Sequence, residues 1–122
     1  MFDLTSEEAR ELLNVALMAT GRNRFSSAAK ILAALEAFRP AEASVAVANA
    51  ILRISMLDFS GAVGYIDREA LRRFPDSAML QAFKGMALIR MNRAEEARVP
   101  LEAAAGQTAD PAAAQLAKDL LT

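Results

Sequence analysis

The alternation of hydrophobic and polar positions along the chain predicts a series of helices separated by short turns. After Thr5, apolar residues recur at intervals of three and four until Thr20-Gly21. This spacing places them on one face of a helix. The same spacing recurs in later stretches, so that seven helices are expected over residues 5–21, 25–38, 41–56, 59–74, 76–91, 93–105 and 110–121. The few Val and Thr residues do not alternate with polar ones, so no strand is expected. The pattern predicts an all-α chain.

Several helix boundaries carry their own signals. Thr5 is followed three residues later by Glu8, the arrangement of a capping box. Pro40 and Pro75 follow the second and fourth stretches, and a proline ring disfavours helix in the residue before it. Asp110-Pro111 combines an N-cap residue with proline at the first helical position, which predicts the start of a last helix.

An internal repeat organises these helices. Small residues near the start of the second helix of each pair are separated by 34 and 35 residues (62 − 28 and 97 − 62): Ala28, Ala62 and Ala97. Three further sets keep nearly the same step: Ala16, Ala50 and Gly85; Phe25, Phe59 and Ala94; Pro40, Pro75 and Pro111. Small side chains let neighbouring helices approach closely, and the period is that of the tetratricopeptide repeat. One residue is inserted before Pro75.

The chain resembles the tetratricopeptide family over residues 9–111, most closely in the third repeat, where Gly85, Leu88, Ala97 and Leu101 fit the family pattern. The usual Trp and Tyr of the first helix are missing, and Arg53 stands at the Tyr-like position of the second repeat. The resemblance implies three helix pairs, at about 5–40, 41–75 and 76–109, and a closing helix at 110–122. We therefore expect one helical-repeat domain over residues 1–122, an α-solenoid.

The composition of the chain excludes several classes of functional site. The chain has no Cys and no His, and 14 basic residues balance 15 acidic ones. Disulfides and thiolate metal sites are therefore excluded, and no charge excess favours nucleic acid. The longest stretches without a charge are ten residues, at 12–21 and 43–52, too short to span a bilayer. The absence of Cys is compatible with a reducing cytosol. We expect a non-enzymatic protein with no catalytic residues, no cofactor, no metal and no membrane insertion.

The first helices of such repeats line a concave face, and here that face is apolar. The residues expected along it, as the partner-binding site, are Leu13, Leu17, Val47, Ile51, Ile54, Met79, Met86 and Ile89. An apolar groove suits an amphipathic helix of a partner protein, and flexible methionines suit irregular partners. Alternatively, these residues pack against each other or against the last helix, or the same face joins two copies of the chain into a structural homodimer.

Within the repeat superfamily, three stretches resemble the small chaperones of type III secretion systems that hold the needle subunit. They are residues 16–21 followed by Ala28-Ala29, residues 58–62, and residues 109–111. The resemblance implies a cytoplasmic chaperone that pairs with a small co-chaperone and wraps the amphipathic helix of a needle subunit, which prevents premature polymerisation. The alternatives are another small repeat protein of secretion gene clusters that is not dedicated to the needle, and a generic tetratricopeptide interaction module.

Overall fold

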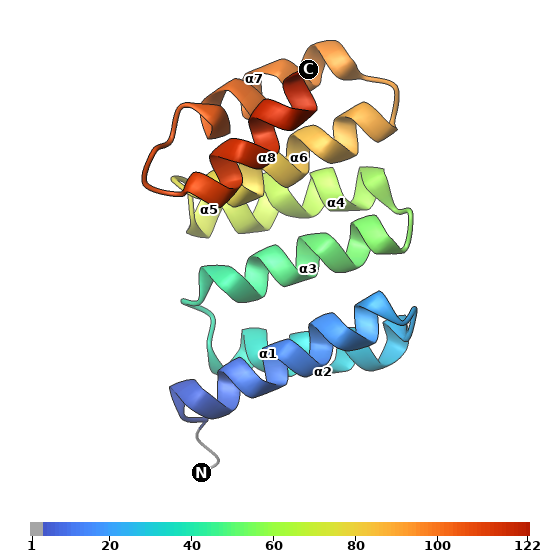
Figure 1. Ribbon diagram of the computed structural model, residues 1–122. Coiled ribbons are helices and arrows are strands. Elements are labelled where there is room, and N and C mark those ends of the chain that lie inside the picture. The colour runs from blue at the N-terminus through green and yellow to red at the C-terminus, as the bar shows by residue number, and fades with distance from the viewer. Residues whose placement is uncertain (1–3) are drawn as a thin grey trace. The chain divides into compact units, whose positions relative to one another are not determined.

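The computed structural model describes residues 4–122, and their regular secondary structure is entirely helical. The elements are α1 (Ser6–Gly21), α2 (Phe25–Phe38), α3 (Ala43–Ser55), α4 (Phe59–Tyr65), the π-helical turn η1 (Ile66–Ala70), α5 (Leu71–Arg73), α6 (Ala78–Arg90), α7 (Ala94–Ala105) and α8 (Pro111–Leu121) (Figure 1). Because α4, η1 and α5 are continuous, the described residues form seven helical stretches. The expectation of an all-α protein is confirmed.

The chain divides into two compact units, residues 1–57 and 58–122. The division falls between the two helices of the second expected repeat, so α3 belongs to the first unit and α4 to the second. Each unit has its own core. The single repeat domain over residues 1–122 therefore stays a prediction.

In the first unit, α1, α2 and α3 each pack against the other two. Ala16 of α1 and Ala28 of α2 have no exposed surface and share a core with Leu32, Leu35 and Leu52, as the small residues of the repeat predict. Burial of these aliphatic side chains stabilises the three-helix unit.

Arg39, just after α2, holds the start of α1 in place. Its Nη1 atom donates to the Leu4 carbonyl oxygen at 3.0 Å, and its Nη2 atom donates to Ser6 Oγ at 2.7 Å. The same nitrogen lies 3.3 Å from Glu42 Oε1. One guanidinium thus joins the beginning of α1 to the connection between α2 and α3.

The capping signals of the sequence are largely confirmed. Thr5 and Glu8 form both hydrogen bonds of the capping box, each 3.1 Å long, and Asp110 Oδ1 accepts from the Ala113 N–H at 3.1 Å. The fifth stretch was expected to begin at Asp76, but α6 begins at Ala78. The reason is that Ser77 is the N-cap, with its hydroxyl accepting from the Leu80 N–H at 3.2 Å.

The residue inserted before Pro75 is accommodated by the π-helical turn η1. The Leu71 N–H donates to the carbonyl of Ile66, five residues earlier, instead of four as in an α-helix. One extra residue is therefore taken up between Ala62 and Pro75 without ending the helix.

In the second unit, α6 packs against α4, α7 and α8. The closing helix α8 contacts both α6 and α7, as α3 contacts α1 and α2, and contributes Ala113 and Ala117 to a core with Ala97 and Leu101. The last helix therefore covers a core. The Lys84 ammonium on α6 lies 2.8 Å from a carboxylate oxygen of Asp67 on η1.

The turns also repeat. Asn23, Leu57 and Asn92 have φ values of 61°, 62° and 62°, in the left-handed region. Each donates its N–H to the carbonyl three residues earlier, at 3.1, 2.9 and 2.9 Å respectively. Their separations, 57 − 23 = 34 and 92 − 57 = 35, match the period of the sequence repeat. The backbone thus keeps the period where the side chains differ.

Candidate functional site

Five of the eight residues expected at the partner-binding site lie in the first unit, on α1 and α3: Leu13, Leu17, Val47, Ile51 and Ile54. Each is partly exposed. Leu13 and Leu17 also pack against the core of this unit, while Val47, Ile51 and Ile54 follow helical spacing along one side of α3. The structure thus places an aliphatic row on each of two helices that contact each other.

The other three residues, Met79, Met86 and Ile89, lie on α6 in the second unit, and each is partly exposed. Met79 and Ile89 pack against the core of that unit. Met79 and Ile89 therefore contribute both to a core and to the surface. That all eight residues form one surface stays a prediction.

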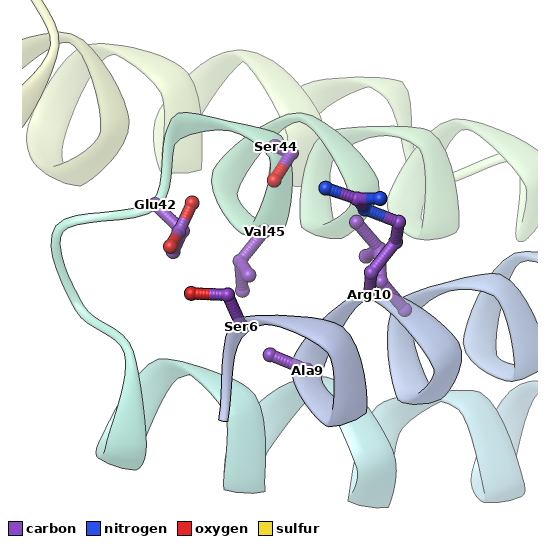
Figure 2. A pocket seen from close by; sticks show the side chains of 7 residues that line it. Ser6, Ala9, Arg10, Glu42, Ser44 and Val45 are labelled. Atoms are coloured by element: carbon purple, nitrogen blue, oxygen red, sulfur yellow. The ribbon is translucent and has the colours of Figure 1, made fainter. Parts of the chain in front are cut away.

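A depression of about 340 Å³ lies between α1 and the start of α3. Ser6, Ala9, Arg10 and Leu13 line it from α1, and Glu42, Ser44 and Val45 line it from the other side (Figure 2). Leu13 is the expected site residue here. The polar residues were missed, although Arg10 precedes Leu13 by three positions and so shares its side of the helix.

The two charged side chains of this depression differ in their partners. The Glu42 carboxylate pairs with Arg39 at 3.3 Å, whereas Arg10 makes no ion pair with any residue from 4 to 122. A guanidinium only donates hydrogen bonds. The α1–α3 depression therefore offers an aliphatic wall, a cation and hydroxyl groups. These groups suit the binding of another molecule.

A second depression, of about 590 Å³, lies in the second unit among the end of α6, α7 and the end of α8. Its lining consists of Ile89, Ala94, Glu95, Arg98, Leu101, Glu102, Leu120 and Leu121. Ile89 is the expected site residue here. Leu120 and Leu121 were missed because their closeness to Ile89 depends on how α8 folds back onto α6 and α7.

Charged side chains lie along α7 and at its N-cap residue Arg93, and three of them, Glu95, Arg98 and Glu102, line the second depression. Arg98 lies 3.6 Å from Glu102, and Arg93 Nη2 donates to Glu96 Oε1 at 2.7 Å. The hydrogen bond from Arg93 lowers the pKa of Glu96, and the carboxylate raises the pKa of Arg93. Glu95 forms no ion pair within the described part of the chain. The rim therefore carries one uncompensated carboxylate.

Among residues 4–122, no three carboxylate-bearing side chains gather closely enough to hold a metal ion. In the same range, no helix has the length and hydropathy needed to cross a membrane. Comparison of the chain with protein-family models, curated proteins and solved structures found no match.

Proposed function

We propose that this chain is a tetratricopeptide-type repeat protein. The sequence repeat at 34 and 35 residues and the left-handed turns at Asn23, Leu57 and Asn92 support this assignment. The burial of Ala16, Ala28 and Ala97 supports it too. In such repeats each helix pair contacts only its neighbours, and the exposed faces of the first helices serve for binding.

The function we propose is that of a non-enzymatic chaperone or adaptor whose α1–α3 face binds an amphipathic helix of a partner protein. The observation that carries this proposal is the pair of aliphatic rows, Leu13 with Leu17 and Val47 with Ile51 and Ile54, which stay partly exposed. An amphipathic helix recognises a groove through residues at spacings of three and four. Covering these rows would remove apolar surface from water, which favours binding.

The cellular role rests on the resemblance to needle-subunit chaperones of type III secretion systems. On this proposal the partner is the needle subunit, bound through its amphipathic helix together with a small co-chaperone in the cytoplasm. Holding that helix would keep the subunit from polymerising before secretion.

Co-expression with a needle subunit and its co-chaperone from the same genome tests this function. The double variant Val47→Asp/Ile51→Asp places two carboxylates on the partly exposed α3 row. We expect it to lose co-purification of the needle subunit, because burying an unpaired carboxylate is costly. The matched control, Ala33→Asp/Ala37→Asp, adds the same charges on exposed positions of α2 and should retain the complex.

Far-UV circular dichroism tests whether both double variants stay helical. Co-purification that survives in Val47→Asp/Ile51→Asp contradicts the assignment of the site to the α1–α3 face. A homodimer in light scattering that this variant dissociates, with no needle subunit bound by the wild type, would instead make the chain a self-associating structural module.

A further inference from the structure

The depression on the second unit has a wall of aliphatic side chains that folding does not fully cover. Leu101 forms a buried part of the lining, whereas Ile89 and Leu120 are partly exposed and Leu121 keeps 40% of its surface in water. Its volume of about 590 Å³ falls within the range of about 300–1,000 Å³ that is typical of ligand pockets. It can therefore receive a large apolar side chain.

The apolar surface continues beyond the depression along α7. Val99 is 74% exposed, and helical spacing places it beside Glu95, four residues before it, and Glu102, three residues after it. A partner would thus meet an aliphatic surface edged by carboxylates.

The charge around this surface has a definite sign. Two carboxylates, Glu95 and Glu102, and one guanidinium, Arg98, line the depression. Arg98 compensates Glu102 at 3.6 Å, and Glu95 has no ion pair among the described residues. The local excess is negative, so a cation beside the apolar group of a ligand gains attraction and an anion loses it.

We propose that the depression lined by Ile89, Leu101, Leu120 and Leu121 is a second protein-binding site, which takes a large apolar side chain of a partner segment flanked by Lys or Arg. Except for Ile89, it shares no residue with the expected partner-binding site. This inference stands independently of the helix-binding face on α1 and α3.

Two amphipathic peptides of about 15 residues, long enough to form a helix, test this site. They are identical in a Leu and Phe stripe and carry either Lys or Glu at the flanking positions. Methyl NMR spectra of the full chain report where each peptide binds. We expect the Lys peptide to shift the methyl signals of Ile89, Leu120 and Leu121, and to bind about fivefold more tightly than the Glu peptide at low salt.

Two variants separate the contribution of the charge to peptide binding from that of the apolar wall. Glu95→Lys should abolish or invert the preference for the Lys peptide, because it reverses the local excess of charge. Glu11→Lys is the matched control: it makes the same change at an exposed position of α1 that does not line the depression, and it should keep the preference. Leu121→Ser should weaken the binding of both peptides, because it removes an exposed aliphatic group.

The proposal is overturned if the Lys peptide leaves the three methyl signals unmoved, or if Glu95→Lys leaves the preference unchanged. It is also overturned if the free chain forms a dimer that Leu121→Ser dissociates, since a second copy would then occupy the depression. None of these results depends on Val47 or Ile51, so failure here is distinguishable from failure of the α1–α3 face.

Discussion

Gly85 of α6 lies against Leu101 of α7 so closely that a Cβ atom at position 85 would overlap both Cγ and Cδ2 of the leucine. Leu101 is 1% exposed and belongs to the core of the second unit. Because the close atoms include the branch point of the side chain, Leu101 could not avoid the clash by rotating one methyl group. The absence of a side chain at Gly85 therefore permits the close approach of α6 and α7.

Replacing Gly85 by Ala is expected to destabilise the protein. Overpacking a core costs about 1–3 kcal/mol, and the better helix propensity of Ala returns about 1 kcal/mol, so the net loss should be up to about 2 kcal/mol. Urea unfolding followed by circular dichroism measures it. Gly21→Ala is the control: nothing lies within 4 Å of the added Cβ, so propensity alone acts and the protein should gain up to about 1 kcal/mol. A stabilising Gly85→Ala would contradict the close approach.

The small residues show why much of the fold could be predicted from the sequence. A position that must be Gly or Ala for helices to touch recurs at a fixed period, so Ala16, Ala28 and Gly85 could be recognised before any contact was known. Local signals were less complete. Ser77 could not be distinguished from Asp76 as the N-cap of α6, because both residue types cap well and only the backbone path selects between them.

Leu57 adopts the left-handed conformation that its counterparts Asn23 and Asn92 also adopt. Asn tolerates this region better than a larger side chain, for which it costs about 1 kcal/mol or more. Since Leu57 is 68% exposed, little burial is lost when it is replaced. We therefore expect Leu57→Asn to raise the free energy of unfolding by about 0.5–1 kcal/mol, measured by denaturant titration.

The converse change provides the control for Leu57. Asn92→Leu puts the disfavoured residue type at the equivalent turn, which has the same φ of 62°, and should lower the free energy of unfolding by a similar amount. If both variants change stability in the same direction, side-chain contacts rather than backbone strain determine the effect.

Glu8 makes part of the stability depend on pH. Its carboxylate accepts from the Thr5 N–H, and the hydrogen bonds with Thr5 lower its pKa below the ordinary value of 4.5. A carboxyl whose pKa is lower in the folded state stabilises that state above the unfolded pKa. This contribution is therefore present at neutral pH and is lost as the pH falls from about 4.5 through the folded-state pKa.

The variant Glu8→Gln isolates this contribution, because Gln keeps a capping oxygen but does not titrate. The wild type should unfold at higher urea concentration than Glu8→Gln at neutral pH, and the two urea midpoints should converge as the pH falls through the lowered folded-state pKa of Glu8. A gap that stays constant over this range would mean that the Glu8 pKa is the same in the folded and unfolded states.

The candidate site was less predictable than the fold. The partial exposure of Leu13, Leu17 and Ile51 could be predicted, because helical periodicity alone assigns each residue to a side of its helix. That these residues bind a partner stays a prediction. The depression that joins Ile89 with Leu120 and Leu121 could not. It depends on α8 packing back onto α6 and α7, a long-range arrangement that no local spacing encodes.

The π-helical turn yields a prediction that links the sequence repeat to stability. If η1 exists to accommodate one inserted residue, deleting a residue from it should restore an α-helix and leave the flanking residues in register. Glu69 is the residue to delete, because its side chain is exposed. The deletion variant should keep cooperative unfolding, and its free energy of unfolding should fall by less than about 2 kcal/mol.

Deleting Gln81 from α6, which has no extra residue, is the control. It would turn the preceding part of the helix by about 100° relative to the rest. Because Ala78 and Ala82 lie on opposite sides of that deletion and share one core, the second variant should lose more than about 4 kcal/mol or fail to fold. Thermal unfolding of both variants separates these outcomes, and equal damage from the two deletions would mean that η1 has a structural role beyond accommodating the insertion.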